Sequence, residues 1–375
     1  MRRFLLAVVL AAAALAAGLA VQRGRTEAEY RRLIEAGDAA LADGRTYAAI
    51  EAFSGALAFR PGSMVAHLRR GEAYQRQDSL AAAARDLTMA AQLDPNATQP
   101  LERLGDVAMT RRDFARAADW YSQAADRDVA SAPLAYRAGH ARYRAGQIGY
   151  ALPLLHRAVE RAPGDGAMHY TLGLARRDAG DPAGARASLE RAVELAPALL
   201  PAREALAGVA REAGDHAEHL RQLEALAGLD PTVPRYVAVA RAAAGAGRTD
   251  RAVLALGSAN DLAAGDPRLR LALARVWLLD AERKNDRASL RKAAEALSHP
   301  GETPTSESLA LAGRLAFLSG SRGDATRRLL DRAVRERPVW PDAFRYQADA
   351  LRAAGRTDEA DAALARYAAL AGERR

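Results

Sequence analysis

Apolar and small residues recur along the chain at intervals of 34 positions, and this periodicity is its main structural signal. One series holds prolines, with Val129 at its single vacancy: Pro61, Pro95, Pro163, Pro197 and Pro231. A second series holds small residues: Gly37, Gly71, Gly105, Gly139, Gly173 and Ala207. A third holds large apolar residues: Phe53, Leu87, Tyr121, Leu155, Leu189 and Leu223. Two alanine series flank the third: Ala49, Ala83, Ala117, Ala151 and Ala185, and Ala56, Ala90, Ala124, Ala158 and Ala192.

Each period predicts two helices of about a dozen residues joined by a turn. Antiparallel helices approach closely only where one presents Gly or Ala, so the small residues are expected at helix contacts. The large residues are expected to fill the space between one hairpin and the next. Proline is expected to end the second helix, because it donates no backbone hydrogen bond. The predicted turn glycines are Gly44, Gly146, Gly180 and Gly214, and the predicted capping residues are Asp113 and Asp181.

This pattern of small, aromatic or leucine, alanine and terminal proline positions resembles the tetratricopeptide repeat family over residues 30–372. The resemblance implies an all-α fold, a right-handed superhelical solenoid of tetratricopeptide-type helical hairpins. It also implies a concave face, formed mainly by first helices, that receives segments of partner proteins. We expect about ten hairpins along the chain.

The repeats lose their regularity toward the C-terminus. Residues are inserted before Pro267, and the stretch from Arg268 to Pro300 begins as an apolar helix and then becomes charged. We therefore predict a regular array over residues 26–267, an eroded repeat and joint over 268–302, and C-terminal hairpins over 303–375. Residues 1–25 are predicted separately, as a signal peptide or a single-pass membrane anchor.

The prediction for residues 1–25 rests on their charge and hydropathy. Arg2 and Arg3 precede an uninterrupted apolar run over residues 4–21, and polar residues follow from Gln22. Such a run is at the lower edge of what spans a bilayer and longer than most signal-peptide cores. We predict membrane contact through residues 4–21 and a single-pass location in the inner membrane, with the repeats outside the cytoplasm. A periplasmic or secreted protein is the alternative if the segment is cleaved.

Composition narrows the classes of function. The chain has 54 Lys and Arg against 46 Asp and Glu, a net charge of +8, and its arginines are scattered among acidic residues. That distribution is typical of a solvated surface, so no nucleic-acid partner is expected. Because the chain has no Cys, disulfides, thiolate metal sites and cysteine nucleophiles are excluded.

A search for catalytic residues finds no convincing group. His216 and His219 are three positions apart and could face one direction on a helix, but no third ligand is evident in the sequence. We therefore expect no catalytic residue, no metal and no cofactor. The alternative is a carbohydrate- or metal-dependent envelope enzyme that uses the irregular region 216–300.

A candidate binding surface follows from the resemblance. Transferring the family's concave-face positions by repeat register places two tyrosines on equivalent sites of adjacent repeats, with a histidine, a third tyrosine and two arginines nearby. Tyr and Arg are enriched at protein interfaces, and Arg pairs with carboxylates, so the ligand is expected to be a peptide or protein segment, possibly acidic. Replacing the two equivalent tyrosines is expected to spare stability. The predicted residues are Tyr136, His140, Tyr143, Arg144, Tyr170 and Arg177.

Together these features predict a non-catalytic protein–protein interaction scaffold. Composition suggests a bacterial origin. With the predicted N-terminal segment, this makes the expected role that of an assembly or biogenesis factor at the bacterial cell envelope.

Overall fold

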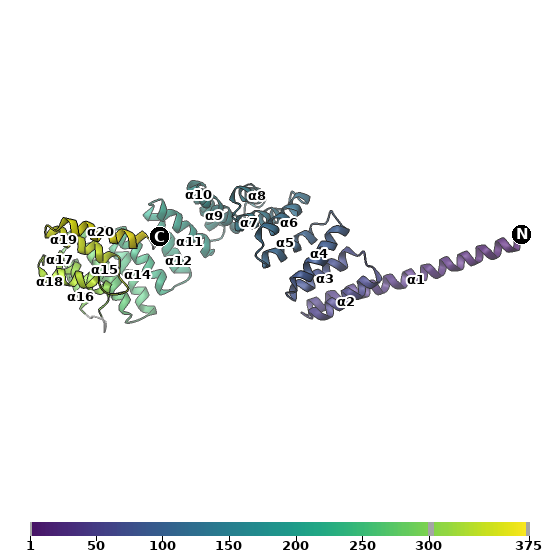
Figure 1. The fold of residues 1–375 in the computed structure, drawn as a ribbon, viewed down its shortest axis with the longest axis horizontal. Coiled ribbons are helices and arrows are strands. Elements are labelled where there is room, and N and C mark those ends of the chain that lie inside the picture. The colour runs from purple at the N-terminus through teal and green to yellow at the C-terminus, as the bar shows by residue number, and fades with distance from the viewer. Residues whose placement is uncertain (1, 299–303, 373–375) are drawn as a thin grey trace. The chain divides into compact units, whose positions relative to one another are not determined.

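The computed structural model describes the backbone of residues 2–298 and 304–372, and the side chains of Leu15 and of residues 17 onward within those ranges. The described residues form twenty α-helices and no strand, so the predicted all-α class is confirmed (Figure 1). Each odd-numbered helix packs against the even-numbered helix that follows it, which gives ten hairpins. The fold is a solenoid of tetratricopeptide-type hairpins, as the sequence predicts.

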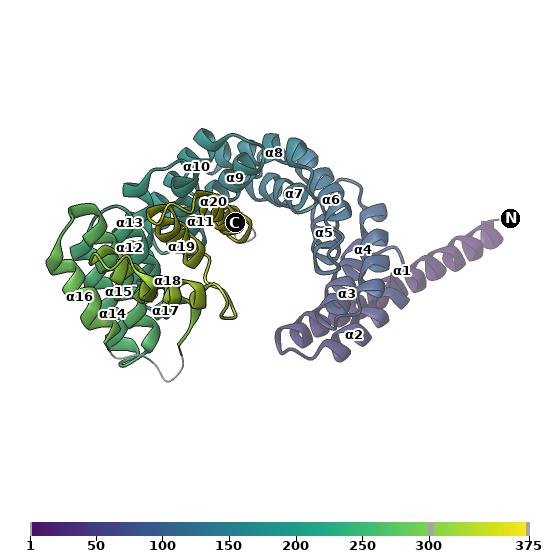
Figure 2. The ribbon, with the colours of Figure 1, turned by 60° about the vertical axis from the view of Figure 1, so that its left-hand side comes forward.

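The chain divides into two compact units, residues 1–196 and 197–375. Unit 1 stacks its hairpins through contacts of α2 with α3, α4 with α5, α6 with α7, and α8 with α9. In Figure 2, α5, α7 and α9 line the inner side of the curve of this unit, and α6, α8 and α10 lie outside. Its helices are α1 (Arg2–Ala42), α2 (Thr46–Phe59), α3 (Met64–Arg76), α4 (Leu80–Leu93), α5 (Gln99–Thr110), α6 (Phe114–Arg127), α7 (Ala132–Arg144), α8 (Ile148–Arg161), α9 (Gly166–Asp178) and α10 (Pro182–Leu195).

Unit 2 has a longer first helix in its third hairpin, where α15 runs for 18 residues. In this unit α15 contacts α13 as well as α14 and α16, and α17 contacts both α15 and α19. Its helices are α11 (Leu200–Glu212), α12 (His216–Leu229), α13 (Val233–Gly245), α14 (Thr249–Leu262), α15 (Pro267–Lys284), α16 (Arg287–Leu297), α17 (Ser306–Leu318), α18 (Asp324–Ala333), α19 (Asp342–Ala353) and α20 (Thr357–Gly372). The predicted joint around Pro300 lies outside the described residues, and the predicted domain boundaries stay predictions.

The small-residue series marks the closest approach within each hairpin of unit 1. A Cβ atom added at Gly139 on α7 would lie 2.8 Å from Cγ of Leu155 on α8 and 3.0 Å from its backbone nitrogen. Gly71 faces Leu87 and Gly173 faces Leu189 in the same way, at 2.8 and 2.7 Å. The large residues therefore pack inside their own hairpin, against the first helix, and Leu87 and Leu155 also belong to buried clusters with Leu104 and Leu172 of the next hairpin, as expected.

The predicted turns are confirmed by backbone geometry. Gly44, Gly146, Gly180 and Gly214 all have positive φ, between 72° and 81°. Asp78 and Arg112 occupy the same register position with φ of 61° and 59°, although an L side chain is disfavoured there.

Both predicted caps are also present, and they fix where α6 and α10 begin. The Asp113 carboxylate accepts a hydrogen bond from the Arg116 backbone N–H at 3.2 Å, and that of Asp181 accepts from Gly184 at 2.8 Å. Each carboxylate satisfies one of the free N–H groups at a helix start.

The prediction of a membrane-spanning segment is wrong. Among the described residues, no helix is long and apolar enough to cross a bilayer. The predicted single-pass location in the inner membrane is corrected accordingly, and a signal peptide within residues 1–25 stays a prediction.

Adding one methyl group at a helix contact tests the packing. We expect Gly139→Ala to lower the free energy of unfolding by about 1 to 3 kcal/mol, because its Cβ would overlap Leu155. Gly149→Ala on α8 is the matched control, since nothing lies within 4 Å of its added Cβ. That change should be neutral or stabilising, because alanine favours the helix. Equal urea midpoints for the two variants would contradict the packing described here.

The turn series predicts a stabilising substitution. Arg112→Gly should raise the free energy of unfolding by about 0.5 to 1 kcal/mol, since glycine adopts positive φ without a steric cost. The reciprocal change, Gly146→Arg, should lower it by a similar or larger amount. Thermal midpoints of the two variants measure this, and a destabilised Arg112→Gly would show that the arginine side chain has another role.

Candidate functional site

An ion-pair ladder runs along the first helices of unit 1. Its cations are Arg69, Arg103 and Arg137, and its anions are Asp38, Glu72 and Asp106; each set repeats at intervals of 34 residues. Arg69 lies 3.4 Å from Asp38 on the preceding first helix, and Arg103 lies 2.7 Å from Glu72. Arg137 continues the ladder to Asp106 at 3.3 Å. Each carboxylate thus either connects two first helices or lies at the end of the ladder.

The ladder stops at α7. The next position of the cation series is Thr171, and that of the anion series is His140. From this point the face of the first helices carries aromatic side chains, which we call the aromatic patch: Tyr136, His140, Tyr143 and Tyr170. The predicted binding residues therefore lie where the ladder of ion pairs ends.

Two residues of the aromatic patch form a stacked pair on α7. The rings of Tyr136 and His140 are 5.8 Å apart and inclined by 10°. The Tyr136 hydroxyl is 3.2 Å from Oγ1 of Thr171 on α9, so this side chain links two successive first helices. Burial and the charge of Arg144 lower the pKa of His140, which keeps its ring neutral near pH 7.

Tyr143 and Arg177 meet at one carboxylate. The Tyr143 hydroxyl donates a hydrogen bond to Oδ2 of Asp178 at 2.8 Å, and Nε of Arg177 donates to Oδ1 at 2.9 Å. Burial, this hydrogen bond and the charge of Asp178 raise the pKa of Tyr143 to about 12, so the hydroxyl keeps its proton. Tyr170 is half-buried on α9 and raises the same pKa further. Asp178 therefore balances positive charge that Arg177 was expected to offer to a ligand carboxylate.

Arg144 lies apart from this cluster. Its guanidinium carbon is 4.6 Å from the centre of the Phe114 ring at the start of α6, toward the preceding hairpin. Its side chain is exposed, so it keeps access to solvent while its position is held by the ring. Of the six predicted residues, the structure joins Tyr136 with His140 and Tyr143 with Arg177, and it leaves Arg144 at the edge.

The expectation that the tyrosines can be removed without loss of stability was wrong for Tyr136. Tyr136 and Tyr143 pack on the buried cluster formed by α7, α8 and α9, which includes Leu155 and Leu172. A change of Tyr136 to Ala would remove this packing together with the bond to Thr171. Binding tests on this face therefore need Tyr170 and exposed arginines.

The ladder was missed in the sequence because its arginines were interpreted as a scattered surface charge. Their register was available: Arg69, Arg103 and Arg137 share the 34-residue spacing of the prolines and glycines. Opposite charges on two such series are the signal that would have indicated ion pairs between successive repeats.

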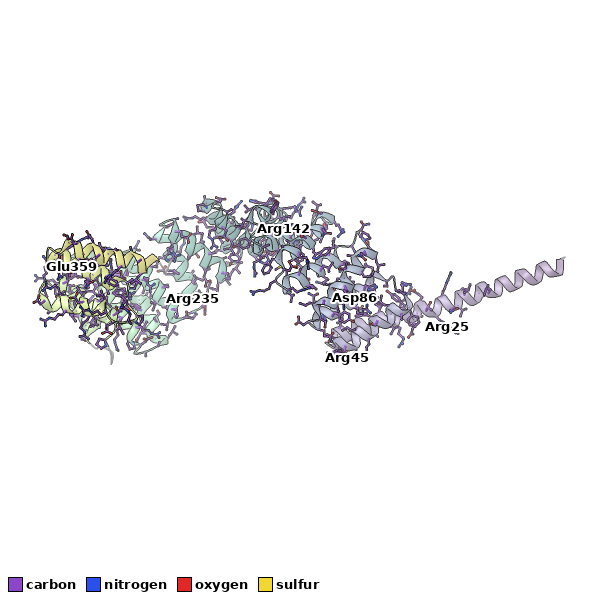
Figure 3. The ribbon with its side chains drawn as sticks, viewed as in Figure 1. Arg25, Arg45, Asp86, Arg142, Arg235 and Glu359 are labelled. Atoms are coloured by element: carbon purple, nitrogen blue, oxygen red, sulfur yellow. The ribbon has the colours of Figure 1, made fainter. Side chains whose placement is uncertain are left out.

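The buried carboxylates have structural partners. Asp86 on α4, labelled in Figure 3, accepts hydrogen bonds from Nε and Nη2 of Arg70 at 2.7 and 2.8 Å. Glu218 on α12 accepts from the Gln222 amide at 2.7 Å and pairs with Arg221. Both carboxylates therefore hold neighbouring side chains in place.

The irregular region 216–300 gives no support to the alternative of a metal-dependent enzyme. His219 replaces an alanine of the repeat, and its Nδ1 donates to the backbone oxygen of Ala207 at 2.9 Å, inside its own hairpin. Within residues 2–298 and 304–372, as far as their side chains are described, no three His, Cys, Asp or Glu residues are grouped to hold a metal ion.

Asp280 is a buried carboxylate of this region that is held by several hydrogen bonds. It is 4% exposed on α15 and accepts hydrogen bonds from Thr249 on α14 at 2.5 Å and from Ser289 on α16 at 2.7 Å. Lys284 lies 2.8 Å from the same carboxylate. Burial alone would raise the pKa of Asp280, but the bonds from Lys284, Thr249 and Ser289 lower it to about 2. This side chain connects three helices where the repeat is least regular.

Comparison with known families supports the fold. The model of the tetratricopeptide repeat matches residues 68–133 and 136–199. These segments are similar to tetratricopeptide repeats. They include the aromatic patch and the ladder from Arg69 to Arg137. No curated protein matches the chain.

Several solved structures are similar to parts of the chain. YrrB, described as a tetratricopeptide protein with an unusual peptide-binding site, is 20% identical and covers 48% of this chain and 94% of its own, with a TM-score of 0.44. MamA from Desulfovibrio magneticus RS-1 is 23% identical over 44% of this chain and 94% of its own, with a TM-score of 0.43. A tetratricopeptide repeat protein from Parabacteroides merdae is 16% identical over 66% and 98%, with a TM-score of 0.47.

The role of Asp280 can be tested by pH. Its folded pKa lies below the ordinary value of about 3.9, so its stabilisation is complete above about pH 4 and is lost as the pH falls toward 2. Asp280→Asn should cost about 2 kcal/mol at pH 7 and should flatten the loss of stability between pH 4 and 2. Asp358→Asn, at an exposed position of α20, is the control. Urea midpoints across this pH range would contradict the assignment if the two variants behaved alike.

Proposed function

We propose that the protein is a non-catalytic scaffold that binds segments of partner proteins on the first-helix face of unit 1, centred on the aromatic patch. The observation that carries this proposal is the change along that face. From Asp38 to Arg137 its charged groups satisfy one another, and at α7 and α9 the charge gives way to half-buried aromatic rings. A ligand gains little by competing with the ladder.

The chemistry of the aromatic patch suits an extended peptide. Tyrosine rings offer apolar contact at a low entropy cost, and their hydroxyls are already oriented by Thr171 and Asp178. A surface that is held in place before binding loses less entropy when a partner docks. Pre-orientation by neighbouring repeats therefore favours this face over the exposed second helices.

Two exposed arginines flank the patch and suit it to acidic segments. Arg144 carries an exposed guanidinium at one edge, and Arg177 at the other is exposed and paired with Asp178. The guanidinium of Arg144, four positions from the neutral His140, adds positive charge beside the rings. The predicted role of the scaffold in envelope assembly stays a prediction.

A cross-linking experiment tests the location of the site. A photo-reactive amino acid placed at Arg177 should cross-link a partner from a lysate of the source organism, and one at Arg85 on α4 should not, because Arg85 is exposed on a second helix. With the captured partner, Tyr170→Ala combined with Arg144→Glu should raise the Kd by about 30-fold, equivalent to about 2 kcal/mol.

Tyr150→Ala on α8 is the matched control for that affinity measurement. It removes the same side chain from a position that is 74% exposed, in the same unit. Its Kd should equal that of the unmodified chain. The proposal fails if the two variants bind alike, or if the double variant loses affinity together with its thermal midpoint.

A further inference from the structure

Unit 2 contains a groove that belongs to neither the ladder nor the aromatic patch. It has a volume of about 450 Å³ and lies between α13, α15 and the hairpin of α19 and α20. We call it the C-terminal groove. Its principal side chains are Arg241, Arg275, Trp340, Arg345, Tyr346 and Tyr367.

The groove has an excess of positive charge. Arg275 pairs with Glu307 on α17, and Arg345 lies 3.3 Å from Asp342 on its own helix. Arg241 is exposed on α13, and no ion pair of its side chain is found in the part of the chain that the structure describes. Three guanidinium groups and the one carboxylate of Asp342 line the groove, and Glu282, which also acts on Arg345, is paired with Arg314. Among the described residues, Arg241 is therefore the lining cation without an ion pair.

Aromatic rings hold two of these arginines in place. The guanidinium of Arg275 lies 4.9 Å from the centre of the Trp340 ring, and that of Arg345 lies 4.9 Å from the Tyr346 ring. Trp340 and Tyr346 contact each other edge to face at 5.7 Å, and the Trp340 backbone donates to Ser306 at 2.9 Å. The cations are thus fixed on a rigid aromatic wall, so little side-chain entropy is left to lose when a ligand binds.

One of these arginines has an unfilled hydrogen-bonding capacity. Nε of Arg275 is buried and finds no hydrogen-bond acceptor among the described residues, whereas Nε of Arg345 is the atom that lies 3.3 Å from Oδ1 of Asp342. A buried donor without an acceptor is uncommon in folded proteins and calls for an explanation. A carboxylate that entered the groove would bring two oxygens to the guanidinium groups of its wall.

We propose that the C-terminal groove binds the carboxylates of an acidic peptide segment. The volume is that of two or three side chains, and the guanidinium of Arg241 supplies the charge that the groove leaves unbalanced. Arginine pairs with carboxylates in a planar, two-pronged geometry, and the tyrosine and tryptophan rings offer contact to the aliphatic part of a glutamate. This inference rests on the proposed function only in taking a peptide as the ligand, and it adds a second site in unit 2.

The test uses a fluorescent hexaglutamate peptide, blocked at both ends, and the full chain. Fluorescence anisotropy should show saturable binding that weakens with added salt. Arg241→Ala should raise the Kd at least tenfold, and it should leave the thermal midpoint unchanged because this side chain is exposed and unpaired. A blocked hexalysine peptide should not bind.

Arg248→Ala is the control for net charge, since Arg248 is an exposed arginine of the same unit outside the groove. It should bind hexaglutamate as the unmodified chain does. Equal weakening by Arg248→Ala and Arg241→Ala, or no binding of hexaglutamate at all, would overturn the proposal. A hexa-alanine peptide with a free C-terminus, compared with its amide, shows whether a terminal carboxylate is accepted in place of side-chain carboxylates.

The variant with Tyr170→Ala and Arg144→Glu separates this proposal from the function proposed for unit 1. It should retain hexaglutamate binding in the C-terminal groove while it loses the partner captured through Arg177. If hexaglutamate binding is lost in that variant and kept in Arg241→Ala, the C-terminal groove is not the site and the acidic ligand belongs to unit 1. If partner capture at Arg177 fails while Arg241→Ala still weakens hexaglutamate binding, the inference stands without the proposal for unit 1.

Discussion

The close approach of the two helices in each hairpin is the constraint on which the rest of unit 1 depends. It requires a residue without a side chain on one helix and a large apolar residue opposite, as at Gly139 and Leu155. Fully buried alanines such as Ala151 and Ala158 surround the contact, and they leave no room for the helices to slide. Because this contact fixes each hairpin, the 34-residue repeat places every first helix in the same relation to the next.

That regularity determines where charges can pair. Residues that share a register position on successive first helices lie side by side, so Arg103 reaches Glu72 and Arg137 reaches Asp106 across neighbouring repeats. The two arginines are 38% and 40% exposed and their carboxylates 14% and 24%, so each pair contributes at most about 1 kcal/mol. Their larger effect is that their charged side chains occupy the surface of the first helices. The proposed binding surface therefore begins where the series of charged residues ends.

The repeat itself could be predicted from the sequence because its cause is local and periodic. Proline, glycine and alanine positions fixed the hairpins, and even the two residues with positive φ, Asp78 and Arg112, lie on the series of turn glycines. The six candidate residues could be placed on the right helices, but their pairing could not, since the sharing of Asp178 by Tyr143 and Arg177 depends on side-chain directions. The predicted membrane span was wrong, since no described helix is long and apolar enough to cross a bilayer.

The C-terminal groove could not be found in the sequence for a related reason. Its residues come from positions 241 to 371, and they meet because α15 is longer than the other first helices of unit 2 and contacts α13 directly. Asp280 stabilises this irregular packing, because its carboxylate joins α14, α15 and α16. A regular repeat would have presented the same face at every hairpin. The irregular one brings aromatic rings and arginines from distant hairpins together, and in both units the proposed ligand surface begins where the repeat pattern changes.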